Sequence, residues 1–321
     1  MEKNLTQGSV LKNVVSFSLP YLLSYFLQTL YGMADLFIIG QFEGVASTTA
    51  VSIGSQVMHM LTVMLVGLAM GATVSIAQAT GRGAKKDASA AIGNTVTLFM
   101  SLSVVLLFVL LVLRGSIVSV MSTPEEAVSG TLDYLTICFI GIPFITAYNI
   151  IASIFRGLGD SKSPMYFIAV ACVVNIALDY YFMGTLRLGP VGAALGTTLS
   201  QAVSVVISLA VIRKKQLIAV RRADLRPCRS VMEKLLKIGV PVALQDGFIQ
   251  VSFVIITIIA NRRGLTDAAA VGIVEKIIGF LFLIPSSMLS TVSALGAQNI
   301  GAGKPERARL TLRYAAMIAC A

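Results

Sequence analysis

The chain has 321 residues, of which 56% are hydrophobic and 12% are charged, and its formal net charge is +10. A soluble domain carries about 25% charged residues, so this sequence lacks the polar surface that a water-soluble globule of its size needs. The composition excludes a soluble fold and predicts an all-α integral membrane protein. The single histidine and the four cysteines have no metal-ligand spacing, so we expect no cofactor.

Apolar runs of about 20 residues or more recur along the chain, separated by polar breaks. They predict membrane spans near 14–40, 46–79, 89–113, 127–155, 164–183, 189–212, 236–260 and 268–298, and a ninth span that begins near 308. Prolines inside these runs are expected to bend their helices, because proline has no backbone N–H to donate. They are Pro20, Pro143 and Pro241.

The basic residues are distributed unevenly between the two ends of the spans. If the N-terminus is cytoplasmic, 20 of the 25 Lys and Arg residues fall at cytoplasmic ends, and nine of these lie between Arg213 and Lys237. This asymmetry predicts a cytoplasmic N-terminus and a basic segment that contacts anionic lipid. We expect no nucleic-acid partner, because the exposed aromatic residues that stack on bases are missing.

Two parts of the sequence resemble each other at a nearly constant offset. AVSIG at 50–54 returns as AVGIV at 270–274, and AQATGRGAKKDA at 77–88 returns as AQNIGAGKPERA at 297–308, in both cases 220 residues later. Six spans separate the copies, so we expect a two-lobed bundle of parallel six-helix repeats. A complete second repeat would extend about 120 residues past residue 321, and we interpret the chain as truncated in its second lobe.

This interpretation divides the chain into three parts. We expect an N-terminal six-helix lobe at 1–213, a basic cytoplasmic linker at 214–235, and a partial C-terminal lobe at 236–321. The last part would hold helices seven and eight and the start of helix nine.

Five acidic residues fall in or near the apolar runs, where a charge costs about 2.5–3.5 kcal/mol: Asp35, Asp133, Asp179, Asp246 and Glu275. Asp133 lies near a helix start, which favours a structural role. Asp35 is in the first span and Asp179 in the fifth, and Asn175 lies one helical turn before Asp179 on the same face. If both acids share one pocket, they cannot easily both be ionised, so one would take a proton or a cation would bind between them. Asn175 and a hydroxyl from Thr197–Thr198 would add neutral oxygen ligands that suit Na⁺.

Other polar residues in the spans carry less information. Gln28 lies two turns before Asp35 on the same face, and Asp246 lies in VPVALQDGF of the seventh span. Glu275 and Lys276 are adjacent and can pair with other groups, which favours a structural role. His59 is typical of a core histidine, and none of the three is assigned a function. Neither a phosphate-binding loop nor a nucleophile–base pair is recognisable, so we expect a gradient-driven transporter and no enzyme.

Several motifs along the chain occur in an order typical of one family. They are an Asp late in span one, FRGLGDSKSP at 155–164, NIALD at 175–179, GPVGAALGT at 189–197, and AQxxGxG closing spans two and eight. In this the chain resembles the multidrug and toxic compound extrusion (MATE) transporters, and most of all their bacterial drug-exporting branch. The resemblance implies a twelve-helix transporter of the cytoplasmic membrane, monomeric when full length, which exports amphipathic, often cationic compounds by alternating access in exchange for Na⁺ or H⁺.

The resemblance also implies a coupling site for the cation. Its residues would be Asp35, Asn175, Asp179 and Thr197, with Thr198 as the alternative to Thr197. Gln28 matches a polar position that lines the same cavity, and Asp246 is the candidate in helix seven.

Two other functions remain open at this stage. A flippase for lipid-linked oligosaccharides belongs to the same superfamily, but its cleft should be lined by basic residues, whereas the candidate lining here is acidic. An ion channel is the alternative from a different class, although a channel does not need two parallel repeats with a titratable pair.

Overall fold

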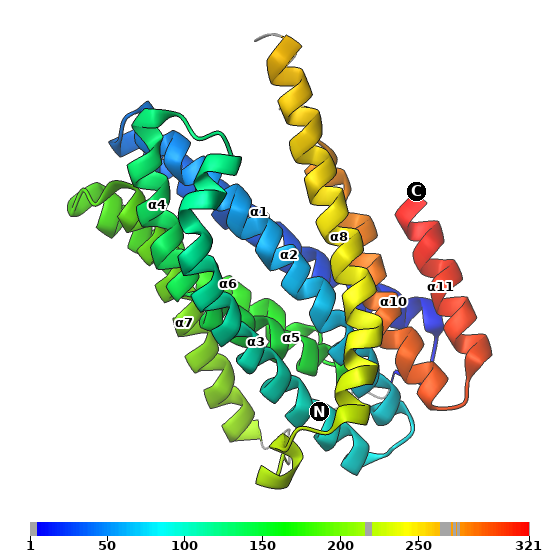
Figure 1. The fold of residues 1–321 in the computed structure, drawn as a ribbon. Coiled ribbons are helices and arrows are strands. Elements are labelled where there is room, and N and C mark those ends of the chain that lie inside the picture. The colour runs from blue at the N-terminus through cyan, green and yellow to red at the C-terminus, as the bar shows by residue number, and fades with distance from the viewer. Residues whose placement is uncertain (1–4, 216–219, 264–270, 272–273, 275–276, 321) are drawn as a thin grey trace.

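The structure is a computed structural model that describes residues 5–215, 220–263, 271, 274 and 277–320 (Figure 1). Within these residues every regular element is a helix, which confirms the predicted all-α class. The helices are α1 (Val10–Phe42), α2 (Val45–Gly81), α3 (Lys85–Val120), α4 (Glu125–Ile140), α5 (Ile142–Gly157), α6 (Lys162–Asp179), the π-helix η1 (Tyr180–Thr185), α7 (Gly189–Lys215), the 3₁₀ turn η2 (Arg222–Leu225), α8 (Arg229–Arg263), α10 (Leu283–Gly301) and α11 (Pro305–Cys320).

The lengths of the helices agree with several crossings of a bilayer. Among the described residues, seven helices are long and apolar enough to span a membrane, and the bent pair of α4 and α5 makes an eighth. The outer face of α3 exposes Val105, Phe108 and Val112, which in a membrane protein is a surface for lipid rather than for water. The start of the predicted span 268–298 lies outside the described residues, as do Glu275 and Lys276.

The predicted span 127–155 is not one continuous helix. It is divided at Gly141 into α4 and α5, whose axes are bent by 49°. Pro143 follows the break and cannot donate a hydrogen bond to the carbonyl four residues earlier, so the α4 ladder ends there. Pro20 and Pro241, in contrast, lie inside α1 and α8, which continue past them.

The repeat in the sequence has a counterpart in the structure. The α2 helix ends with the Arg82 N–H bonded to the Gln78 carbonyl, and α10 ends 220 residues later with Ala302 bonded to Gln298. Each end is followed by a left-handed glycine, Gly83 at φ +70° and Gly303 at φ +71°. The same local sequence therefore ends α2 and α10 in the same way.

The ends of α2 and α10 also contact each other reciprocally. The Cα of Gly81 lies against the carbonyl oxygen of Gln298, and the Cα of Gly301 lies against the carbonyl oxygen of Gln78. Such an exchange of equivalent contacts is what an approximate two-fold relation between parallel repeats produces. Because glycine has no Cβ, the two backbones can approach this closely.

The breaks that carry most of the basic residues gather at one end of the molecule. The Lys304 ammonium bonds the Thr6 carbonyl at 2.9 Å, and Gln298 Nε2 bonds the Gly157 carbonyl at 3.0 Å. The segment after α7 returns to the same end, where Asn94 of α3 bonds the Asp224 carbonyl at 3.3 Å and the Cys228 N–H at 2.7 Å. α8 begins at Arg229, so the last residues of the predicted linker are helical.

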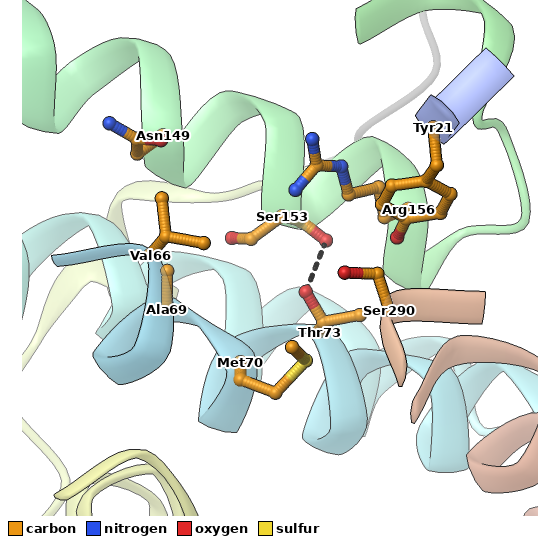
Figure 2. A pocket seen from close by; sticks show the side chains of 9 residues that line it. All are labelled: Tyr21, Val66, Ala69, Met70, Thr73, Asn149, Ser153, Arg156 and Ser290. Carbon is orange, nitrogen blue, oxygen red and sulfur yellow. Dashed lines mark hydrogen bonds between the residues drawn. The ribbon is translucent and has the colours of Figure 1, made fainter. Parts of the chain in front are cut away.

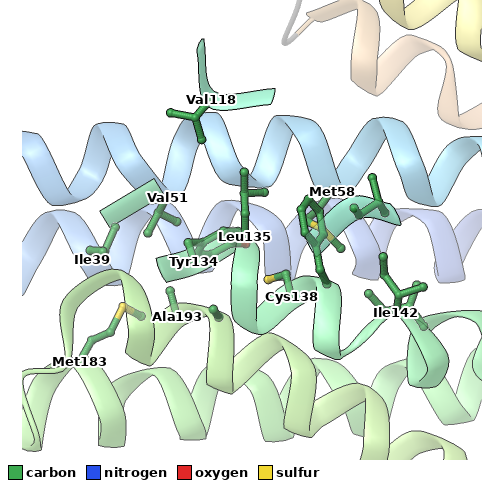
Figure 3. Close-up of a cluster of buried hydrophobic side chains, with 14 of the residues drawn as sticks. Ile39, Val51, Met58, Val118, Tyr134, Leu135, Cys138, Ile142, Met183 and Ala193 are labelled. Atoms are coloured by element: carbon green, nitrogen blue, oxygen red, sulfur yellow. The ribbon is translucent and has the colours of Figure 1, made fainter. Parts of the chain in front are cut away.

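Toward the other end of the bundle, an apolar core lies between α1, α2, α4 and α7 (Figure 3). Ile38 and Ile39 of α1 and Ala193 and Ala194 of α7 are at most 1% exposed in it. These pairs lie about one turn from Asp35 and Thr197, respectively. The core therefore positions the two helices that carry these polar side chains.

Candidate cation-coupling site

Asp35 is the centre of a buried polar cluster between α1, α6 and α7. Its side chain is 3% exposed, although the helix that carries it has several neighbouring residues at the surface. The Thr197 hydroxyl of α7 donates a hydrogen bond to Asp35 Oδ2 at 3.2 Å. The predicted contact between the first and sixth spans is thus present in the structure.

The α6 helix supplies the other two members of this cluster. Asn175 and Asp179 are 1% and 0% exposed, and both side chains lie close to the Asp35 carboxyl group, which accepts the hydrogen bond from Thr197. Asp179 is the last residue of α6, and the wider π-helix η1 begins at the next residue. A π-helical segment changes the direction of the side chains that follow, and such segments are frequent at functional sites.

Gly196 gives Asp179 the room that it occupies. Asp179 Oδ1 lies directly against the Cα of Gly196, so a Cβ at that position would overlap the carboxylate. Gly196 precedes Thr197, and one turn of α7 therefore both admits Asp179 and carries the hydroxyl that binds Asp35. The sequence alone does not indicate this role for Gly196, because it does not show which residue of another helix lies against it.

Five buried atoms of the cluster have no hydrogen-bond partner among the described residues. They are Asp35 Oδ1, both carboxylate oxygens of Asp179, and Oδ1 and Nδ2 of Asn175. Among the described residues, the one ion pair joins Arg309 to Glu306. No basic side chain of these residues therefore neutralises Asp35 or Asp179. Unpaired buried oxygens of this kind are costly unless a proton, a cation or water completes them.

The chemistry of these atoms suits the coupling ion that was predicted. Two carboxylates, an amide oxygen and a hydroxyl are hard oxygen ligands, as Na⁺ requires, and the carboxylates are also proton acceptors. Asp35 and Asp179 repel each other when both are ionised, so binding of either ion at one of them relieves the repulsion. These residues therefore have the chemistry to bind one cation or proton and to release it again.

The structure distinguishes between the two adjacent threonines. Thr197 faces Asp35, whereas the Thr198 hydroxyl lies against Gly141 at the bend between α4 and α5 and near Cys138. Successive residues of a helix point about 100° apart, so only one of the two can face the acids.

The remaining predicted site residues do not join the cluster. Gln28 is partly buried on α1. Asp246 is partly buried on α8, and its Oδ2 packs against α2 at Gly67. Neither is among the side chains close to the Asp35 carboxyl group, and their place in a substrate cavity stays a prediction. The expectation that His59 is a core histidine is wrong, because His59 is exposed on α2.

Four further residues near Asp35 were not assigned to the site from the sequence. They are Tyr31, Tyr134, Cys138 and Cys172, each close enough to interact electrostatically with the Asp35 carboxyl group. Tyr31 precedes Asp35 by one turn of α1, and Cys172 precedes Asn175 by about one turn of α6. The helical spacing indicates Tyr31 and Cys172 when it is extended by one turn from Asp35 along α1 and from Asn175 along α6.

Comparison with known proteins agrees with this architecture. The MatE family model matches residues 20–181 and 241–321. The probable multidrug resistance protein YpnP of Bacillus subtilis is 30% identical over 304 residues, which cover 95% of this chain and 68% of that protein. The multidrug export protein MepA of Staphylococcus haemolyticus is 25% identical over 303 residues, which cover 93% of this chain and 66% of that protein.

Solved structures show the same fold. A MOP superfamily transporter from Pyrococcus furiosus superimposes with a TM-score of 0.90 at 26% identity, over 98% of this chain and 70% of that one. A multidrug resistance MATE family transporter in an outward-facing conformation gives a TM-score of 0.89 at 25% identity, over 98% and 70% of the two chains.

The fold defines a multi-pass membrane protein built from parallel helical repeats. This chain belongs to the MatE family.

Proposed function

We propose that this protein is a drug-efflux transporter that exports amphipathic, cationic compounds across the cytoplasmic membrane in exchange for Na⁺ or H⁺. The observation that carries the proposal is the cluster of Asp35, Asn175, Asp179 and Thr197, whose buried oxygens lack partners among the described residues. An acidic site without a basic counter-charge favours cations, both as coupling ion and as cargo.

The coupling follows from the competition for these oxygens. When the cation is bound, the two carboxylates are neutralised and can remain buried between α1, α6 and α7. When it leaves, their repulsion favours a rearrangement of α1 relative to α6 and α7, which alters the cavity for cargo. Exchange of the cation on one side for the drug on the other is then antiport by alternating access.

We further propose how the parts of the chain share this task. The lobe at 1–213 holds the coupling site, the linker at 214–235 lies in the cytoplasm with the N-terminus, and the lobe at 236–321 forms part of the opposite wall. The relatives named as multidrug resistance and export proteins support an efflux function for this chain. In this proposal the transporter acts as a monomer.

The test is dye efflux from vesicles that contain the protein, with a pH gradient and a sodium gradient imposed separately. We expect one of the two gradients to drive efflux of a cationic dye, and Asp35→Asn or Asp179→Asn to abolish it. Each substitution removes an ionisable oxygen while keeping nearly the same volume.

Asp133→Asn is the matched control, because Asp133 is an exposed acid of α4. It should leave efflux unchanged. Efflux that survives both cluster substitutions at normal expression would refute the coupling site, and efflux that neither gradient drives would refute antiport.

A further inference from the structure

An open apolar groove lies between α1, α10 and α11, and none of its lining residues belongs to the Asp35 cluster. It measures about 220 Å³. Its apolar walls include Leu19 and Leu22 of α1, Ile284 and Met288 of α10, and Ile318 of α11. Leu19 is 55% and Ile284 43% exposed, so in a membrane protein the groove opens toward lipid.

The two polar residues of the lining leave the groove without a free donor. The Ser18 hydroxyl donates to the Val15 carbonyl at 3.2 Å, and the Ser287 hydroxyl donates to the Ile284 carbonyl at 2.8 Å. An apolar cavity of about 150 Å³ stays dry and takes up hydrocarbon. The occupant that fits this groove is therefore a hydrocarbon chain, and not water or a polar compound.

The polar groups of the contact between α1 and α10 lie on its inner side (Figure 2). The Arg156 guanidinium carbon is 4.5 Å from the centroid of the Tyr21 ring, which is 2% exposed. Tyr25 and Ser290 share a hydrogen bond of 2.8 Å. The contact thus separates a polar interior from the apolar groove outside.

A positive charge lies on the same face of α1 as the groove. Lys12, Val15, Leu19 and Leu22 follow one another at intervals of three, four and three residues, which is the spacing of one helix face. Lys12 is exposed, and the ion pair recorded among the described residues involves other side chains. From Lys12 to Leu22 the helix rises about 15 Å, which is half of a hydrocarbon core of about 30 Å. This stripe therefore matches one lipid of one leaflet, with its head group at Lys12.

The repeats indicate that the groove stays open to lipid. They relate α1 to α8, α2 to α10 and α3 to α11, at an offset of 220 or 221 residues. Among the described residues, α8 packs against α2 and α3 and against none of the helices α4 to α7. Helices of the second repeat that correspond to α4–α7 would, by the same arrangement, leave α1 uncovered beside α10 and α11.

We propose that this groove binds one acyl chain of an anionic phospholipid, whose phosphate head group is held by Lys12. The apolar walls select the chain, and the lysine selects a lipid with a net negative charge over a zwitterionic one. The lipid contacts both repeats, because α1 belongs to the first and α10 and α11 to the second. The proposal does not depend on the coupling site.

The test uses a tryptophan as reporter, because the chain has none of its own. Leu19→Trp places one at the exposed edge of the groove, in vesicles of phosphatidylcholine and phosphatidylglycerol of which either lipid is brominated. We expect brominated phosphatidylglycerol to quench this fluorescence with an apparent association constant about fivefold greater than that of brominated phosphatidylcholine. Val105→Trp, on the lipid-facing side of α3 at 56% exposure, should show no such preference.

A second substitution in the Leu19→Trp protein tests the head-group contact. Lys12→Gln should remove the preference for phosphatidylglycerol, whereas Lys86→Gln should retain it, because Lys86 is an exposed lysine of α3 outside the groove. Equal quenching by the two lipids at Leu19→Trp, or a preference that survives Lys12→Gln, would overturn the proposal. Weaker quenching by both lipids at Leu19→Trp than at Val105→Trp would also overturn it, since a second copy of the chain would then cover the groove.

Discussion

At the scale of single residues, the candidate site is defined by which side chains share a small buried volume. Asp35, Asn175 and Asp179 are each at most 3% exposed, and most of their polar atoms lack partners among the described residues. The Thr197 hydroxyl donates a hydrogen bond to Asp35. Loss of this hydroxyl should therefore weaken ion binding without removing a charge.

Thr197→Val should raise the concentration of coupling ion at half-maximal efflux by about tenfold or more, because a hydrogen bond to a charged group contributes about 1.5–3 kcal/mol. Thr198→Val is the matched control, since its hydroxyl faces Gly141 instead of Asp35. The measurement is efflux as a function of the driving ion. Equal effects of the two substitutions would contradict the assigned orientation of α7.

Gly196→Ala should impair efflux as strongly as a change at Asp179 itself, although it removes no polar atom. The added methyl group would occupy the place of Asp179 Oδ1 and displace the carboxylate from the cluster. The comparison is Gly40→Ala, because the space next to Gly40 of α1 is open. Normal efflux in Gly196→Ala would show that the position of Asp179 is not required.

At the scale of elements, glycines determine how closely α2, α8 and α10 approach. Gly71 of α2 lies against the Leu235 carbonyl of α8, and Gly239 of α8 lies against the Leu68 carbonyl of α2. Gly81 and Gly301 do the same between α2 and α10. Without an attraction between apolar surfaces inside lipid, such close backbone packing is a main source of helix association.

Gly81→Ala should lower the stability by about 1–3 kcal/mol, because its methyl group meets the backbone of Gln298, which cannot move aside as a side chain can. Thermal unfolding in detergent measures the loss. Gly115→Ala in α3 should have the opposite sign and stabilise by up to about 1 kcal/mol, since the space there is open and alanine favours a helix. Losses of the same size in both variants would contradict the predicted contact.

At the scale of the whole molecule, the question is which end faces the cytoplasm. The basic breaks gather at one end of the bundle, as the contacts Lys304–Thr6 and Asn94–Asp224 indicate. The positive-inside rule then predicts that this end is cytoplasmic. Cys228 lies there, exposed and just before α8.

In a Cys320→Ser background, a membrane-impermeant maleimide should label Cys228 in inside-out vesicles and not in intact cells. Its hydrogen bond with Ser230 lowers the pKa of the Cys228 thiol below the usual value, so more of the reactive thiolate is present at neutral pH. Labelling should therefore continue to lower pH than for a free cysteine. Cys228→Ser is the control, and labelling in intact cells would reverse the orientation.

Much of the fold could be predicted from the sequence because lipid imposes simple constraints on a chain. Apolar runs of sufficient length must be helices that satisfy their own backbone groups. This rule located α1, α2, α6 and α7 to within a few residues, whereas α3 continues to Val120, well past its predicted end at 113. The rule failed at Gly141, because hydropathy is averaged over a run and does not register one missing N–H at Pro143. It also missed the π-helix after Asp179.

The sequence by itself determined the class of protein, the parallel repeats, and the residues that had to be functional or paired because they are ionisable inside apolar runs. Only the tertiary structure decided which of them meet: Asp35, Asn175, Asp179 and Thr197 converge, whereas Asp246 packs against α2 at Gly67. It also decided that Thr197 faces the acids and that Gly196 makes room for Asp179. The physical reason is that spacing along one helix determines the face of a residue, while contact between helices depends on their rotation and separation, which the packing of many distant side chains sets together.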